Sequence, residues 1–259
     1  MRILIVFLFS VLLIPSPAGA AFAGSDLILP AVGRVDGSGQ SRFFTTVWVT
    51  NPSSQTASYQ MQFLPAGQAN TSPLTVRDTI AAGATKVYEN IAEGVFGVKS
   101  ALGATRFRSD QPLLVSARIF NLYAGTGESD SAGQFMSAIP ANFGLERGES
   151  APLQGARATG DYRYNMFFVE TSGGGVTARI SVLDQAGIVI HASTFSLLPF
   201  EQRLISLSSL IGNRIVPDAN VTVELVDGDG RLYGVGSLVS NTSQDGTLFE
   251  MRFPDRVLG

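Results

Sequence analysis

The stretch Thr105–Asn121, TRFRSDQPLLVSARIFN, decides the fold because the chain contains it in two versions. A short β-type run leads to Ser109-Asp110-Gln111-Pro112, a composition typical of turns, and a longer apolar run then ends at Asn121. Val221–Asn241, VTVELVDGDGRLYGVGSLVSN, has the same layout about 120 residues later. Each stretch predicts a β-hairpin, and the pair predicts an internal repeat.

The segments around the two stretches also follow one another in the same order. Arg42–Asn51 matches Tyr162–Thr171 at an offset of 120, and the alternating segment Ala57–Leu64 matches Thr177–Leu183. Many short β-type segments separated by turn signals, with 28 glycines and 12 prolines in the chain, are typical of β-sandwiches. We therefore expect an all-β fold of two tandem antiparallel β-sandwich (Ig-like) units, related by an internal repeat of about 120 residues.

The chain divides into an expected export signal and two units. In residues 1–20, Arg2 precedes the apolar stretch Ile3–Ile14, and Ala18-Gly19-Ala20 has the pattern of a cleavage site. That apolar stretch is shorter than the roughly 20 residues that a membrane-spanning helix needs. We expect residues 21–145 to form the first unit and residues 146–259 the second. The protein is then exported, periplasmic or extracellular, with no membrane span after removal of the signal.

The composition excludes some classes of partner. The chain has 18 basic and 21 acidic residues, a net charge of −3, and no basic cluster of the kind that binds nucleic acid. It has no cysteine, so an exported fold must be stabilised by its core and its hydrogen bonds alone. The remaining candidate partners are a protein or a polysaccharide at the cell surface.

No residue set identifies a reaction, a cofactor or a metal. His191, the only histidine, has Ser193 two residues away, but no nucleophile elbow or equivalent accompanies the pair. Asp227-Gly228-Asp229-Gly230 lacks the further ligands of a calcium loop and reads as a turn. A calcium site pooled from this loop and two other turn aspartates, Asp184 and Asp245, stays open. We assign no catalytic, cofactor-binding or metal-binding residue.

Four aromatic residues form the one candidate site. Phe44 and Trp48 share a face of their predicted strand, and Tyr164 and Phe168 occupy the same positions at the offset of 120. Both faces of these strands are partly apolar, although a simple sandwich buries only one. We expect this second face to be covered by the other unit, by a partner or by a ligand. Aromatic residues that could stack on sugar rings, or fill the sandwich cores instead, are Trp48, Tyr59, Tyr88, Tyr162, Tyr164 and Tyr233.

The arrangement resembles the tandem β-sandwich repeats of exported bacterial proteins, which are mostly of unassigned function. The second unit departs from the pattern of the first, with Glu170-Thr171-Ser172 and Asp227-Gly228-Asp229-Gly230 at the matching places. The resemblance implies a fold rather than an activity. The residues that carry it are Thr50-Asn51-Pro52, Phe96-Gly97, Ser109–Ser116, Arg118–Asn121 and Gly133-Gln134-Phe135.

The sequence therefore predicts an exported, non-enzymatic binding or structural module, at the cell envelope or outside the cell. One alternative is a carbohydrate-binding module that uses exposed aromatic residues. Another alternative is a secreted hydrolase, or an accessory subunit of one.

Overall fold

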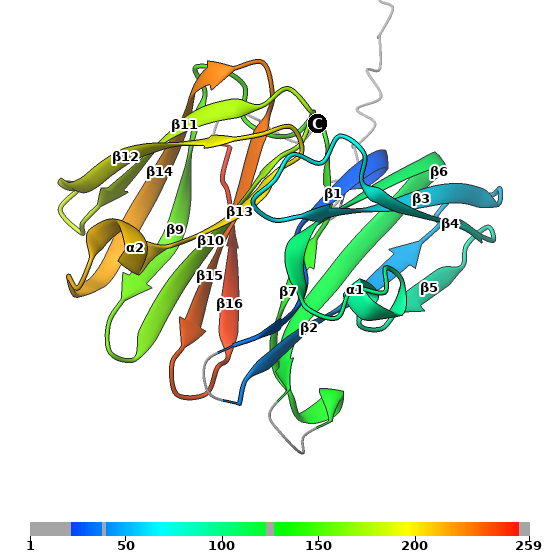
Figure 1. The fold of residues 1–259 in the computed structure, drawn as a ribbon, viewed down its shortest axis with the longest axis horizontal. Coiled ribbons are helices and arrows are strands. Elements are labelled where there is room, and N and C mark those ends of the chain that lie inside the picture. The colour runs from blue at the N-terminus through cyan, green and yellow to red at the C-terminus, as the bar shows by residue number, and fades with distance from the viewer. Residues whose placement is uncertain (1–21, 38–39, 123–126, 254–259) are drawn as a thin grey trace, which may run out of the picture.

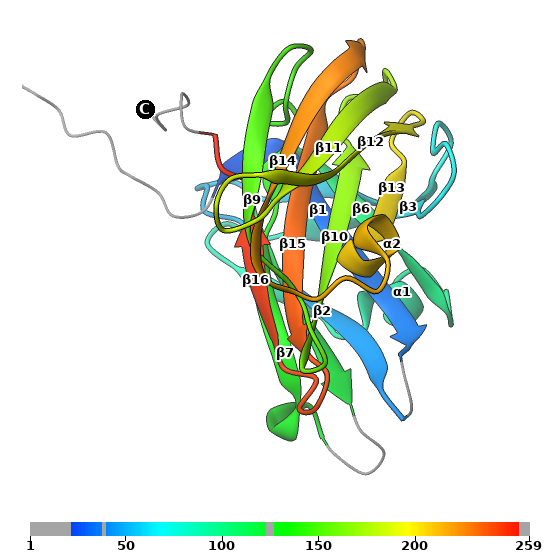
Figure 2. The same cartoon turned by 90° about the vertical axis from the view of Figure 1, so that its left-hand side faces the viewer.

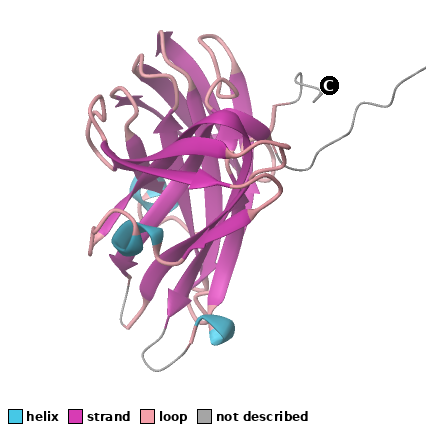
Figure 3. Cartoon of the chain, turned by 90° about the vertical axis from the view of Figure 1, so that its right-hand side faces the viewer, coloured by secondary structure: helices cyan, strands magenta, loops and turns pink. Residues whose placement is uncertain are grey.

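The computed structural model describes residues 22–37, 40–122 and 127–253. Its sheets are antiparallel and its helices are short, which confirms the all-β class (Figure 3). None of the helices in these ranges is long and apolar enough to cross a membrane. The expected export signal lies outside the described residues.

The N-half, residues 22–140, is one eight-stranded sheet that curls into a half-barrel (Figure 1). Its main order is β4-β3-β6-β1-β2-β5, with β7 beside β6 and β8 beside β1. A short helix, α1 (Ile91–Gly94), buries Ile91 and Ala92 in the core of this half, and a 3-10 turn, η1, spans Glu128–Asp130. The strands are β1 (Ala23–Asp36), β2 (Arg42–Thr50), β3 (Ala57–Pro65), β4 (Leu74–Ile80), β5 (Thr85–Tyr88), β6 (Ala101–Leu122), β7 (Ala132–Ser137) and β8 (Ile139–Pro140).

The C-half, residues 145–253, has two four-stranded sheets, with the orders β13-β10-β15-β16 and β12-β11-β14-β9. Side chains from both sheets meet in one hydrophobic cluster. Figure 2 shows the second sheet nearest the viewer, the first sheet behind it and the N-half beyond. The elements are β9 (Ser150–Ala158), β10 (Tyr162–Glu170), β11 (Val176–Leu183), β12 (Val189–Leu197), β13 (Gln202–Ser206), α2 (Leu207–Ile211), β14 (Val216–Gly228), β15 (Leu232–Ser240) and β16 (Gly246–Glu250).

The predicted hairpin in the N-half does not form, because β6 runs through the expected turn without a break. Its first part pairs with β3 as far as Ser109, and its pairing with β2 begins at Leu114. Pro112 lies between these two ladders, where its missing N–H removes no hydrogen bond to β2 or β3. The turn-like composition therefore marks a change of partner strand rather than a reversal of the chain.

In the C-half the chain does turn at Asp227–Gly230, but β14 and β15 belong to different sheets and do not pair. Gly228 has a φ of 104°, and a side chain there would meet the Gly175 carbonyl, so the turn requires glycine. The neighbours of β14 are β11 and β9, and those of β15 are β10 and β16. The two parts of β6 have neighbours in a corresponding order, first β3 and β1, then β2 and β7.

The two halves share buried surface. Four residues of the N-half, Ile28, Leu64, Ala104 and Ile139, belong to the core cluster of the C-half. In the other direction, Phe167 on β10 packs against the clusters of both halves. The connecting segment is also packed, because Leu145 is buried and exchanges backbone hydrogen bonds with Leu232. The boundary expected at residue 145 therefore lies in a packed segment and not in a free linker.

Polar contacts connect the halves at both ends of this seam. The loop after β3 reaches the C-half, where Gly67 N donates to Gln202 O at 2.9 Å and Asn70 Nδ2 donates to Phe200 O at 2.8 Å. On the other side Gln134 Nε2 donates to Ser237 Oγ at 2.8 Å. These bonds and the shared apolar surface hold the two halves in one arrangement.

Candidate functional site

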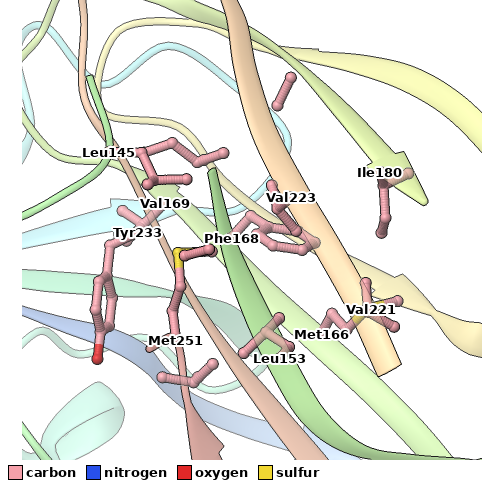
Figure 4. Close-up of a cluster of buried hydrophobic side chains, with 14 of the residues drawn as sticks. Leu145, Leu153, Met166, Phe168, Val169, Ile180, Val221, Val223, Tyr233 and Met251 are labelled. Carbon is pink, nitrogen blue, oxygen red and sulfur yellow. The ribbon is translucent and has the colours of Figure 1, made fainter. Parts of the chain in front are cut away.

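The structure places two of the four predicted site residues inside the C-half. Tyr164 and Phe168 are buried on β10 and belong to the hydrophobic cluster of the C-half. Figure 4 shows Phe168 among the other core side chains. The Phe168 ring lies 4.9 Å from that of Phe195, between centroids, and the Tyr164 hydroxyl donates to Gln154 O at 2.7 Å. Neither residue is free to contact a ligand or the N-half.

The other two residues, Phe44 and Trp48, are half-buried on β2 and belong to neither hydrophobic cluster. Phe44 stacks on Phe120 at 6.0 Å and lies under the Arg34 guanidinium. The structure therefore does not bring the four aromatic residues together. On β10, Phe167 packs against the cluster of the N-half, and it lies on the opposite face from Tyr164 and Phe168.

The aromatic residues considered for sugar stacking are mostly unavailable. Tyr59, Tyr164 and Tyr233 are each exposed by 2% or less. Tyr162 has its ring covered by the guanidinium of Arg157 at 5.0 Å. The part of the chain that the structure describes thus offers no row of open aromatic faces from this set.

The polar candidates lie apart from one another. His191 is half-buried on β12, with its Nε2 3.0 Å from Ser193 Oγ, and no described carboxylate hydrogen bonds to its ring. Asp184 accepts hydrogen bonds from two backbone N–H groups of its own turn, and Asp245 from one. Within the described ranges no three His, Asp or Glu side chains group closely enough to hold a metal ion.

An open groove of about 970 Å³ lies on the N-half. It lies over β4, β3, β6 and the start of β1, and the residues that line it all have polar side chains. The strand register builds it, because Gln60 on β3 lies opposite Arg77 on β4 and opposite Arg108 on β6. Asp26 on β1 continues the same row beyond Arg108. The side chains that the row and its neighbours contribute are Asp26, Ser58, Gln60, Arg77, Arg108 and Asp110.

The two arginines of this row have no partner among the described residues, either by hydrogen bond or by ion pair. Both are exposed. The carboxylate nearest in register, Asp26, is already held by Arg106, with Nε–Oδ1 and Nη2–Oδ2 distances of 2.7 and 2.6 Å. Asp110 Oδ1 accepts from the backbone N–H of Ser58 at 2.8 Å. The groove therefore presents two uncompensated guanidinium groups about two strand spacings apart, roughly 10 Å.

Beneath the edge of the groove, a hydrogen-bonded chain fixes β4 against β3 and β5. Tyr59 bonds Tyr88 through their hydroxyls, Tyr88 donates to Asp78 Oδ2 at 2.6 Å, and Lys86 Nζ donates to Asp78 Oδ1 at 2.7 Å. Burial raises the pKa of Tyr59 to about 12, and burial together with the bond to Asp78 raises that of Tyr88. Burial alone would raise the pKa of Asp78, but the bonds from Lys86 and Tyr88 outweigh it and lower that pKa. The edge strand is thus held by an ionised carboxylate at neutral pH.

Replacing Tyr88 by phenylalanine should lower the free energy of unfolding by about 1 kcal/mol at pH 7, because Asp78 loses a hydrogen bond. A carboxyl group with a lowered folded-state pKa adds stability above its unfolded pKa, and this stability disappears as pH falls through the folded-state value. The difference between Y88F and the wild type should therefore shrink below about pH 4. Urea unfolding at pH 7 and pH 3 measures it. Tyr162→Phe, whose hydroxyl has no described partner, is the control, and an equal Y88F deficit at both pH values would contradict the role given to Asp78.

Sequence reasoning missed Arg77 and Arg108 for a physical reason. The alternation in Ala57–Leu64 indicated an outward polar face on β3. Which strands flank β3, and in which register, depends on pairing between segments far apart in the chain. Arg108 lay within the stretch quoted first, but the turn expected after it hid its place in a continuous strand.

No protein-family model matches the chain, and no curated protein sequence matches it. A solved structure similar to it is the crystal structure of Thermotoga maritima 1070, with a TM-score of 0.34 and 13% sequence identity. That match covers 48% of this chain and 96% of the other.

Proposed function

We propose that the protein is an exported, non-enzymatic binding module that holds an extended polar ligand in the groove of its N-half. The observation that carries this proposal is the row Arg77–Gln60–Arg108, set in register across three paired strands. Side chains on paired strands keep fixed spacings, so the row offers a ligand donors and acceptors that are already in position. The groove is open and has a volume of about 970 Å³.

The surroundings of the row favour binding over a purely structural role. Unpaired arginines on a strand surface add little to stability, and an internal carboxylate could have neutralised them, as Asp26 does for Arg106. The network of Tyr59, Tyr88 and Asp78 makes the strands of the groove rigid. A rigid site with free hydrogen-bond donors binds with a smaller loss of conformational entropy.

Two finer points of the proposal concern the whole chain. Export is supported by the pattern of residues 1–20, because charge, apolar run and cleavage site follow in the order of a signal peptide. We also infer that the two halves are copies of one β-sandwich unit, of the kind seen in tandem repeats of exported bacterial proteins. The corresponding order of neighbours along β6 and along β14 with β15 supports this inference.

A bulky side chain in the groove should abolish binding. Ser58 is exposed, lines the groove and lies on the same face of β3 as Gln60, so Ser58→Trp should fill the groove without disturbing the core. Affinity electrophoresis of the mature protein through gels that contain neutral or acidic polysaccharides measures the effect. At least one polysaccharide should retard the wild type, and S58W should lose that retardation. Thr194→Trp, on the exposed face of β12, should keep it.

Two outcomes would refute the proposal. Either none of the polysaccharides retards the wild type, or S58W is retarded as strongly as T194W. Circular dichroism of both variants checks that each retains the β fold.

A further inference from the structure

The chemistry of the free arginine pair points to the class of ligand. A guanidinium presents a planar pair of N–H donors that matches a carboxylate in a bidentate contact. The same chain shows this geometry internally, where Arg106 holds Asp26 through two bonds. Arg77 and Arg108 have the same donors and lie free in the groove. They can therefore hold two separate carboxylates of one ligand.

The acidic residues of the groove limit how densely the ligand can be charged. Asp26, Asp78 and Asp110 all line it, and like charges at close range repel. A polyanion with several charges on every sugar, such as a polysulfate, would meet these carboxylates. A ligand with isolated carboxylates among hydroxyl groups would not, because each hydroxyl can donate to Asp110 or bond to Gln60 and Ser58.

We infer that the groove binds an acidic polysaccharide, a glycan chain in which carboxylate-bearing sugars recur among hydroxyl-rich faces. The inference rests on the proposed function and names its ligand class. Arg77 and Arg108 each take one carboxylate, and Gln60 between them bonds to sugar hydroxyls. Because β4, β3 and β6 are neighbours, the glycan crosses the strands rather than running along one of them.

Polygalacturonate is the probe, and fully methyl-esterified polygalacturonate is its neutral counterpart with the same backbone. Titration of the mature protein by isothermal calorimetry should show binding to polygalacturonate that weakens about tenfold or more on esterification, since charge-assisted bonds are lost. Arg77→Gln and Arg108→Gln should each weaken binding about tenfold. Lysine variants at these positions should bind more weakly than the wild type and more tightly than the glutamine variants, because they keep the charge and lose the bidentate contact.

Arg179→Gln is the matched control, since Arg179 is also an exposed strand arginine but already pairs with Glu224 at 3.1 Å, far from the groove. It should bind polygalacturonate like the wild type. Dextran sulfate tests for simple ion exchange, and it should bind more weakly than polygalacturonate at the same ionic strength.

The outcomes separate the inference from the proposed function. Equal binding of the esterified and free polymers would overturn the acidic ligand and leave the groove as the binding site. An equal loss in R179Q, or stronger binding of dextran sulfate, would overturn the selective role of the arginine pair. If no polysaccharide retards the protein, both the inference and the proposed function are overturned.

Discussion

Truncation of Phe168 to alanine should lower the free energy of unfolding by about 3–5 kcal/mol, the range for large aromatic side chains removed from a core. Phe168 is fully buried between the two sheets of the C-half, and its ring packs on Phe195. A Cβ built on Gly234, opposite it on β15, would lie 2.6 Å from the ring, so the ring occupies the space that this glycine leaves. Gly234 has no side chain of its own that could move into the cavity.

Chemical denaturation followed by circular dichroism measures the loss. Phe135→Ala removes the same side chain from a residue that is 61% exposed, and should change stability by less than about 0.5 kcal/mol. If F168A does not fold, Phe168→Leu provides a smaller cavity and a measurable midpoint. A loss in F168A no larger than that in F135A would show that Phe168 is not a core residue.

The all-β class could be predicted from the sequence because it depends on local signals. Alternation and turn composition act over a few residues, and predicted segments such as Arg42–Asn51 and Ala57–Leu64 coincide closely with the observed strands β2 and β3. The pairing of the strands was harder to predict from the sequence. Ser109-Asp110-Gln111-Pro112 has the composition of a turn, yet the chain there stays extended because β1 pairs with β6 on both sides of it.

The aromatic residues of the predicted site were chosen from an alignment of β2 with β10 that was shifted by one residue. The offset of 120 aligned Trp48 with Phe168. Two buried residues at the ends of the strands, Asn51 directly after β2 and Glu170 at the end of β10, are separated by one residue less than that offset. A shift of one position exchanges the two faces of a strand. With these two residues aligned, Trp48 corresponds to Phe167, which does contact the other half, and buried Val49 corresponds to buried Phe168.

The expectation that something covers the second apolar face therefore holds for β10, but it was assigned to the wrong residues. A strand with apolar groups on both faces needs cover on both, and β10 has its own core on one face and the N-half on the other. No comparable local sequence pattern marks the groove arginines, Arg77 and Arg108. They are candidates for ligand binding because they lack partners among the described residues, and this can be seen only in the folded structure.

Glu170, where the second unit departs from the pattern of the first, carries the other large expected effect. Its side chain is fully buried and accepts five hydrogen bonds. They come from Ser172 N and Oγ, Gly173 N, Phe200 N and Arg231 N, at 2.7 to 3.1 Å. One carboxylate thus joins three turns of the C-half. Among them Phe200 has a φ of 55°, a strained conformation for a residue with a side chain.

Glu170→Ala should cost about 3 kcal/mol or more, because several backbone N–H groups lose their acceptor inside the protein. Glu170→Gln keeps the size of the side chain but turns one acceptor into a donor that faces other donors, so it should also destabilise, by less than alanine. Glu224→Gln is the matched control. Glu224 forms an exposed ion pair with Arg179, and its loss should cost less than about 1 kcal/mol.

The same experiment reports on the seam between the halves. Trp48, the only tryptophan, lies in the N-half, so its fluorescence follows that half while Glu170 acts in the other. Phe200, held by Glu170, stacks under Arg106 of the N-half at 4.7 Å, and four N-half residues lie in the C-half cluster. Loss of the C-half should expose them, so the Trp48 transition of E170A should shift to lower denaturant together with the circular dichroism. If the Trp48 fluorescence midpoint of E170A equals that of the wild type, the N-half unfolds independently of the C-half. If the unfolding curves of E170Q and E224Q coincide, the Glu170 carboxylate does not hold the turns.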